Sequence, residues 1–264
     1  MDFTEPKIMG IINVTPDSFY GGSRVDSVSA LLSKAEAMAN EGVDVFDVGG
    51  YSTRPGASEI SVTEEIDRVL SSIEVLKKHF PEIPISIDTF RASVAREAIY
   101  NGAEVINDIS GGALDSAMFP LVAELQVPYI LMHMRGNPKN MQEHTNYQNL
   151  LIDILFDLAD KVKELRSSGV KDIIVDPGIG FAKNIDQNFE LIKELKQFQI
   201  LGCPILIGIS RKSFIYKTLK ITAEDSLNAT TALHTFALLN GANILRVHDV
   251  KEANEVKELI QKLI

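Results

Sequence analysis

Residues 7–22 read K-I-M-G-I-I-N-V-T-P-D-S-F-Y-G-G, an apolar run that gives way to a polar loop. The apolar part, residues 8–13, is too short for a helix, and a segment containing Pro and Gly follows it directly. This order predicts a buried strand that delivers polar side chains to a surface. An ordinary strand and turn would also fit the stretch alone, but the same order recurs along the whole chain.

The recurrences predict strands that alternate with helices. The expected strands are residues 8–13, 43–48, 83–87, 105–106, 127–132, 173–175, 205–209 and 244–247. Apolar spacing predicts a helix over 27–40, a capping box at Ser61 and Glu64 opens another, and the closing helix is expected to bury Leu259 and Leu263. About eight such units predict an α/β fold, a (β/α)8 TIM barrel, as a single domain over residues 1–264. An open doubly wound sheet is the alternative.

Composition excludes several classes of function. The chain carries 26 Lys and Arg against 36 Asp and Glu, a net charge of -10, which disfavours binding to nucleic acid or to anionic membranes. No basic and apolar leader and no apolar run of about 20 residues is visible, so we expect a cytoplasmic protein. Cys203 is the only cysteine, which rules out a disulfide within the chain, and no His or Cys spacing suggests zinc.

Polar residues follow the expected strands. In a barrel the carboxyl ends of the strands meet at one mouth, which brings together Asn13, Thr53, Arg54, Asp88, Asn107, Asp176, Lys212, Arg246 and His248. The acceptors and amides of this set suit a flat heterocycle with several N–H donors, and the cations suit an anion.

Four of these residues, and the nearby His133, also have a structural explanation. Asp88 and Asp176 precede helices and could be N-caps. Arg246 and His248, which alternation places on one face of a strand, could form a surface ion pair. His133 could be a hydrogen-bonded core histidine.

Eight segments in this order resemble one known family. They are M-G-I-I-N-V-T-P-D-S-F, D-V-G-G-Y-S-T-R-P-G, S-I-D-T, I-N-D-I-S-G-G, L-M-H-M-R-G-N-P-K-N-M-Q, D-P-G-I-G-F, S-R-K-S and R-V-H-D-V, from Met9 to Val250. Together they resemble the dihydropteroate synthases of the pterin-binding barrel family. The loop after Phe19 departs from the family pattern: it reads Tyr20-Gly21-Gly22, one residue shorter than the usual S-D-G-G.

The resemblance implies a transferase that joins 6-hydroxymethyl-7,8-dihydropterin diphosphate to 4-aminobenzoate, releasing diphosphate and 7,8-dihydropteroate for folate biosynthesis. It implies Mg²⁺ as cofactor, sulfonamide analogues as inhibitors and a homodimer. Its site residues fall into overlapping groups: Asp88, Asn107, Met132, Asp176 and Lys212 for the pterin; Asn13, Thr53, Arg246 and His248 for the diphosphate, with Asn13 also the metal ligand; Phe19, Thr53, Arg54, Pro55, Phe181, Ser210 and Lys212 for aminobenzoate; and Lys212, Arg246, His248 and Asn13 as catalytic.

Two alternatives remain at this stage. A methyltransferase of the same superfamily would bind a pterin but would need no diphosphate site. A non-catalytic pterin-binding protein would need a broken anion site. The intact S-T-R-P-G, S-R-K-S and R-V-H-D-V segments favour the synthase.

Overall fold

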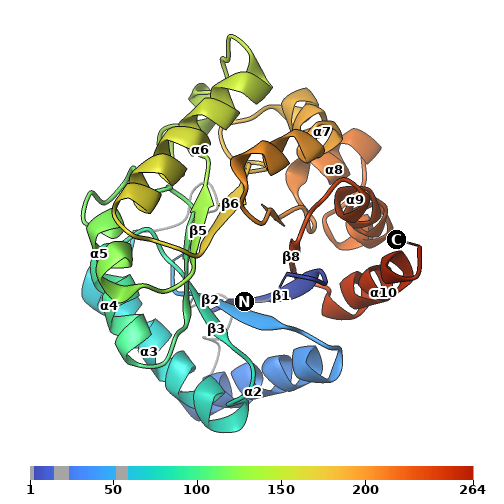
Figure 1. Ribbon diagram of the computed structural model, residues 1–264. Coiled ribbons are helices and arrows are strands. Elements are labelled where there is room, and N and C mark those ends of the chain that lie inside the picture. Colours follow the sequence, from blue (N-terminus) through green and yellow to red (C-terminus); the bar gives the residue numbers. More distant parts are fainter. Residues whose placement is uncertain (1–2, 15–23, 52–58, 264) are drawn as a thin grey trace.

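The computed structural model describes residues 3–14, 24–51 and 59–263, which form eight parallel strands with helices around them (Figure 1). The strands are β1 (Lys7–Asn13), β2 (Val45–Gly49), β3 (Ile85–Asp88), β4 (Val105–Asp108), β5 (Tyr129–Met132), β6 (Ile173–Asp176), β7 (Leu206–Ile207) and β8 (Ile244–Val247). Each coincides with an expected strand to within about two residues.

The strands form a closed barrel. Their order is β6-β5-β4-β3-β2-β1-β8-β7, and every pair is parallel. A parallel bridge between Val175 and Ile205 joins the two ends of this order. The predicted TIM barrel is therefore confirmed, and the open sheet is wrong.

Helices connect the strands and cover the outside of the barrel. They are α2 (Arg24–Asn40), α3 (Val62–His79), α4 (Ala92–Tyr100), α5 (Met118–Leu125), α6 (Leu150–Ser167), α7 (Ile185–Lys193), α8 (Ser213–Leu219), α9 (Leu227–Leu239) and α10 (Val250–Gln261), with short 3-10 turns at Met141–Glu143, Leu195–Leu201 and Glu224–Ser226. The sequence pattern did not single out α5, α8 or α9. In α5, Pro120 stands in the first turn, where its missing N–H costs nothing but interrupts the apparent pattern.

Two local predictions need correction. The Ser61 hydroxyl does cap α3 by accepting from the Glu64 backbone N–H at 3.1 Å, but the Glu64 carboxylate pairs with Arg68 at 2.5 Å instead of completing a capping box. On α10 the buried residues include Val256 and Ile260. Leu259 and Leu263, which we expected to be buried, are 68% and 75% exposed.

Apolar side chains fill the lower half of the barrel. Met9, Val45, Val105, Ile130, Ile174, Leu206 and Ile244 form one buried cluster there. Each residue comes from a different strand, and Phe3 packs against the cluster. This layer fills the amino-terminal half of the barrel interior, so a ligand meets the inner polar residues from the carboxyl ends of the strands.

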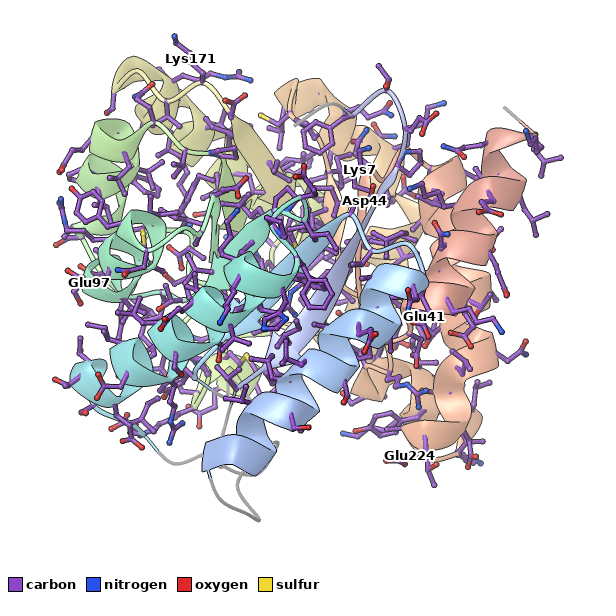
Figure 2. The ribbon with its side chains drawn as sticks, turned by 90° about the horizontal axis from the view of Figure 1, so that it is seen from below. Lys7, Glu41, Asp44, Glu97, Lys171 and Glu224 are labelled. Carbon is purple, nitrogen blue, oxygen red and sulfur yellow. The ribbon has the colours of Figure 1, made fainter. Side chains whose placement is uncertain are left out.

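Many charged side chains lie on the outside of the molecule. Figure 2 shows Glu97 and Glu224 at the periphery, and Lys7 beside Asp44, with 3.6 Å between ammonium and carboxylate. Among the helices described, none is long and apolar enough to cross a membrane.

Candidate active site

A polar layer lies directly above the apolar cluster. Side chains alternate along a strand, so Asn107 points to the same side of β4 as Val105, into the barrel. The parallel register pairs Asp88 with Asn107 and Met132 with Asp176, which places all four on the inner face. Arg246 follows Ile244 on β8 in the same way. The structure therefore brings the expected pterin residues Asp88, Asn107, Met132 and Asp176 to one mouth, together with Arg246.

Arg246 is held by two carboxylates inside the barrel. Its Nε lies 2.6 Å from Asp47 Oδ2, and one terminal nitrogen lies 2.5 Å from Asp88 Oδ2. Asp47 also accepts from the Asn107 amide at 3.1 Å. The ion pair is interior, so the surface ion pair considered for Arg246 and His248 is wrong.

Asp47 is a site residue that sequence reasoning missed. It is fully buried at the centre of β2, within V-F-D-V-G. A carboxylate two residues after Val45 in an otherwise apolar strand was the available signal, because that spacing points both side chains into the barrel.

Burial and neighbouring carboxylates raise the pKa of Asp88 and so favour its protonated form. Burial raises the pKa of Asp88 to about 7; the Arg246 guanidinium opposes this shift, and Asp47 adds to it. For Arg246 burial lowers the pKa, but the carboxylates of Asp47 and Asp88 outweigh burial and leave it raised. Arg246 therefore stays charged, and Asp88 exchanges its proton near neutrality.

Asp176 begins a tight loop, residues 176–181, at the end of β6. Its Oδ1 accepts from the Gly178 N–H at 2.7 Å. Gly178 has a φ of +74°, and a Cβ there would stand 2.0 Å from the His133 carbonyl oxygen, so only glycine fits. The N-cap explanation is wrong for both aspartates, since Arg91 and Asn184 occupy the caps of α4 and α7.

Lys212 reaches across to the same loop. Its ammonium donates to the Ile179 carbonyl and lies 4.8 Å from the centre of the Phe181 ring. Burial lowers the pKa of Lys212 to about 8, and the Asp176 carboxylate opposes the shift. The expected aminobenzoate residues Phe181 and Lys212 are thus in contact, although they come from different strand ends.

Arg211 fixes the direction of its two neighbours, Ser210 and Lys212. Its backbone is left-handed, with a φ of +53°, and its guanidinium binds both Asp249 carboxylate oxygens at 2.8 Å. The Ser210 hydroxyl accepts from the His248 N–H at 3.2 Å and lies 3.2 Å from His248 Nδ1. The loops after β7 and β8 are therefore joined at two points.

Asn13 ends β1, the strand paired with β8, so it lies beside the segment that carries His248. Its half-buried side chain makes no hydrogen bond to any residue that the structure describes. Within the described ranges, no group of three or more His, Cys, Asp or Glu side chains could enclose a metal ion. The donor set fits an ion that takes one amide oxygen from the protein and the rest of its ligands from water and phosphate. Phe19, Thr53, Arg54 and Pro55 lie outside the described residues.

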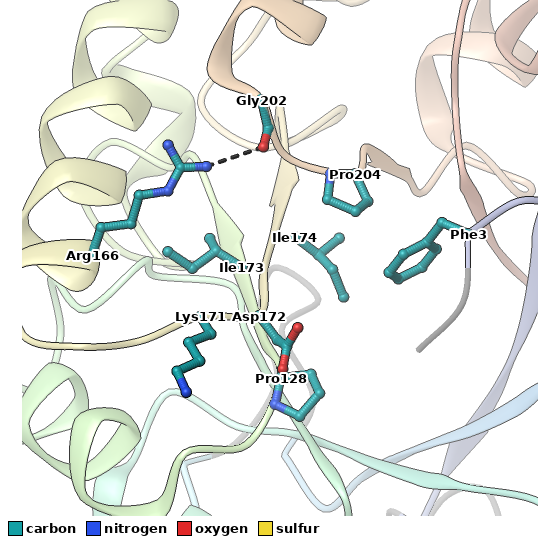
Figure 3. Close-up of a pocket in the computed structure, with 9 residues that line it drawn as sticks. All are labelled: Phe3, Pro128, Arg166, Lys171, Asp172, Ile173, Ile174, Gly202 and Pro204. Atoms are coloured by element: carbon teal, nitrogen blue, oxygen red, sulfur yellow. Dashed lines mark hydrogen bonds between the residues drawn. The ribbon is translucent and has the colours of Figure 1, made fainter.

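A separate cavity of about 140 Å³ lies at the opposite end of the barrel (Figure 3). Its walls include Pro128 and Pro204, which precede β5 and β7, together with Phe3, Lys171 and Arg166. The Arg166 guanidinium is bound to the Gly202 carbonyl at 3.0 Å. The cavity is on the side associated with barrel stability, away from the residues described above.

Comparisons with known proteins agree with this geometry. The family described as pterin binding enzyme matches residues 9–248. The chain belongs to this family. It is 39% identical to dihydropteroate synthase of Escherichia coli K12, covering 99% of this chain and 93% of that protein. It is 42% identical to a folate synthesis bifunctional protein of Arabidopsis thaliana, covering 97% of this chain but only 56% of that longer protein.

Solved structures of the pterin-binding enzymes share the fold over the whole chain. A Yersinia pestis dihydropteroate synthase in a sulfonamide drug complex superposes with a TM-score of 0.91 at 36% identity, covering 100% of this chain and 96% of that one. A Xanthomonas albilineans dihydropteroate synthase with 4-aminobenzoic acid gives 0.91 at 35% identity, covering 100% and 94%. The resemblance inferred from the eight sequence segments is confirmed.

Proposed function

We propose that this chain is a dihydropteroate synthase, which condenses 6-hydroxymethyl-7,8-dihydropterin diphosphate with 4-aminobenzoate and releases diphosphate and 7,8-dihydropteroate. The observation that carries the proposal is the polar layer of the barrel. Acceptors on three strands, Asp88, Asn107 and Asp176, face the same mouth as the cations Arg246 and Lys212. Relatives about 40% identical over nearly the whole chain carry the same name.

The pterin would lie over the polar layer. Asp176 and Asp88 would accept its N–H donors, Asn107 would donate or accept through its amide, and Met132 would contact the ring. Asp88 is already bound to Arg246 through one oxygen, which leaves the other carboxylate oxygen for the ligand. Lys212 would exchange its contact with the Ile179 carbonyl for a pterin acceptor.

The diphosphate would lie near Asn13, Arg246 and His248, at the ends of the adjacent strands β1 and β8. Arg246 would supply charge-assisted hydrogen bonds to the departing oxygens. Mg²⁺, when bound, would neutralise part of the diphosphate charge, with Asn13 as its protein ligand.

The reaction we propose is a dissociative substitution at the pterin CH2. The C–O bond breaks, and its electron pair leaves with the diphosphate. The amine of 4-aminobenzoate then forms the new C–N bond and releases a proton to solvent. The aryl amine is neutral near pH 7, so leaving-group stabilisation carries most of the catalysis and no general base is needed. Phe181, Ser210 and Lys212, with Phe19, Thr53, Arg54 and Pro55, would enclose the aminobenzoate.

We also propose a homodimer. Phe236 and Leu239 on α9 and Leu259 on the adjacent α10 are exposed by 41%, 53% and 68%, and large apolar side chains of this kind suit a contact with a second copy. Sedimentation equilibrium tests the stoichiometry. The cytoplasmic location expected from the sequence stays a prediction.

The deciding experiment incubates the purified chain with both substrates, with and without Mg²⁺, and measures diphosphate and 7,8-dihydropteroate. Equal amounts of the two products, dependent on aminobenzoate, are expected, and chelation of Mg²⁺ should lower the rate. Omitting aminobenzoate is the control. Binding of a pterin without release of diphosphate would refute the synthase and favour the methyltransferase or the non-catalytic alternative.

A further inference from the structure

Lys183 is a buried cation that the proposed reaction does not use. It is 2% exposed and lies just after the loop 176–181. Its Nζ is 2.9 Å from the Gly178 carbonyl, 2.8 Å from the Phe181 carbonyl and 3.1 Å from His133 Nδ1. Because carbonyl oxygens only accept, Lys183 donates to both, and a protonated Lys183 directs its third hydrogen at His133. An ammonium is therefore fully satisfied here without solvent.

Two lysines bind this one loop through different carbonyls. Lys212 donates to the Ile179 carbonyl and lies over the Phe181 ring. Lys183 donates to the carbonyls of Gly178 and Phe181. Lys183 is thus a fixed support of the loop. Lys212 is the lysine that the proposed mechanism releases for the substrate.

Both lysines act on the same carboxylate. Burial raises the pKa of Asp176; the Lys212 ammonium, the Gly178 N–H and the Lys183 ammonium, in that order, oppose the rise. Asp176 already accepts from the Gly178 N–H, and it can accept further N–H donors through both oxygens only when it is ionised, because protonation turns one carboxyl oxygen into a donor. If Lys212 turns to a ligand, Lys183 is the cation that stays with the loop.

We infer that Lys183 is a positioning residue that holds Asp176 in its ionised form and fixes the loop 176–181 for the pterin. The inference rests on the proposed function, since it assumes that Asp176 accepts from a pterin. Lys183 would not contact the pterin itself; it acts on the ligand through Asp176.

Other titratable or charged groups interact with this pair and enter its titration. They are His133, Arg135, Asp157, Lys161, Lys212 and Arg246. Burial, followed by the Lys183 ammonium, lowers the pKa of His133 to about 2, so His133 is neutral throughout. Burial lowers the pKa of Lys183 to about 7, and Asp176 opposes the shift. Lys183 is therefore charged at the acid side of neutrality, where Asp176 needs a cation most.

The test compares the affinity of 6-hydroxymethylpterin, measured by calorimetry between about pH 6 and pH 8, in the unmodified chain, in three variants of Lys183 and in one control variant. Lys183→Met removes the charge and the hydrogen bonds. Lys183→Gln removes the charge but keeps N–H donors for the two carbonyls, and Lys183→Arg keeps the charge. Lys193→Met is the matched control, because Lys193 is a lysine of α7 that is 77% exposed.

Without the Lys183 charge the pKa of Asp176 rises, so Asp176 loses its negative charge as the pH falls. Relative to the unmodified chain at the same pH, both neutral variants should lose affinity progressively, by up to about tenfold for each pH unit below the new pKa. The ratio of the two affinities at one pH removes the effect of Asp88 and Lys212, because these residues titrate in the variant and in the unmodified chain alike. Lys193→Met should show a constant ratio, and Lys183→Arg should match the unmodified chain below about pH 7, where Lys183 itself is charged.

A pH-independent ratio in folded Lys183→Met and Lys183→Gln would overturn the inference. Unfolding of both would also overturn it, because it would assign the ammonium to fold stability instead of the charge of Asp176. Diphosphate binding, which uses residues of β1 and β8, reports whether each variant is folded. Failure of the proposed function is distinguished by the unmodified chain, which would then bind the pterin but form no dihydropteroate.

Discussion

Replacing Arg246 with methionine removes the cation that the buried Asp47 and the largely buried Asp88 share. Asp47 is fully buried, Asp88 is 15% exposed, and both lie within 2.6 Å of the guanidinium. Methionine keeps an unbranched stem as far as the position of Nε and carries no charge. The variant therefore keeps the packing of the stem and removes the guanidinium.

The expected loss of stability has two parts. Breaking a buried ion pair from one side costs about 3 to 5 kcal/mol, and the lower end applies because Asn107 continues to donate to Asp47. Asp88 adds a second part that depends on pH. Its pKa is about 7 with Arg246 present and rises further without it. Each pH unit in which Asp88 is ionised in the unmodified protein but protonated in the variant adds about 1.4 kcal/mol to the difference.

The sign follows from proton binding. A carboxyl whose pKa is higher in the folded state stabilises that state at low pH, and this stabilisation is lost as the pH rises to the folded pKa. In the unmodified protein the loss ends near pH 7, whereas in Arg246→Met it continues above pH 7. The difference in the free energy of unfolding should therefore be about 3 kcal/mol near pH 6 and should widen toward pH 9.

Urea unfolding at several pH values measures this difference. The control is Arg96→Met, which removes an exposed pair with Glu124 and should leave the free energy of unfolding nearly unchanged at every pH, because solvent screens that pair. A difference for Arg246→Met that is constant or narrows as the pH rises would refute the assignment of Asp88 as the titrating partner.

Three further predictions concern ligand binding. Asp176→Asn should weaken pterin binding about tenfold to a hundredfold, because an amide N–H opposes a ligand donor; unchanged affinity by calorimetry would remove Asp176 from the pocket. A sulfonamide should raise KM for 4-aminobenzoate without changing kcat, and a fall in kcat at saturating aminobenzoate would contradict a shared pocket. Asp249→Asn weakens the ion pair that holds Arg211, the residue between Ser210 and Lys212. The variant should raise KM for aminobenzoate severalfold more than it raises the Kd for the pterin. Equal increases in KM, from steady-state kinetics, and in Kd, from calorimetry, would argue against a local role.

The barrel and most of its inner residues were predictable because strand ends carry an unmistakable pattern. Asp88, Asn107 and Asp176 each follow a short apolar run, and parallel register then fixes their direction. The family resemblance added the roles. Met132 is an example, since nothing in its residue type alone indicates a ligand.

What the sequence could not reveal depends on contacts between distant segments. Asp47 appeared to be part of a buried apolar strand, and its role emerges only when β8 brings Arg246 to it. Lys183 followed the recognised loop by two residues, but its direction depends on the positive φ of Ala182, +50°. The sequence alone allowed His133 to be either a site residue or a hydrogen-bonded core histidine. Its contact with Lys183 identifies it as a buried structural residue.

The barrel has a weak seam. β7 is only two residues long, and a single bridge between Val175 and Ile205 joins it to β6. The loop carrying Asp176 and the loop carrying Lys212 leave the barrel on opposite sides of this seam, and Lys212 spans it to reach Ile179. Few ladder hydrogen bonds therefore resist a local change in the distance between the expected pterin and aminobenzoate residues. Hydrogen exchange of the backbone amides from Ile205 to Ile207 should be faster than in β1 to β5, and should slow when a ligand connects the two loops.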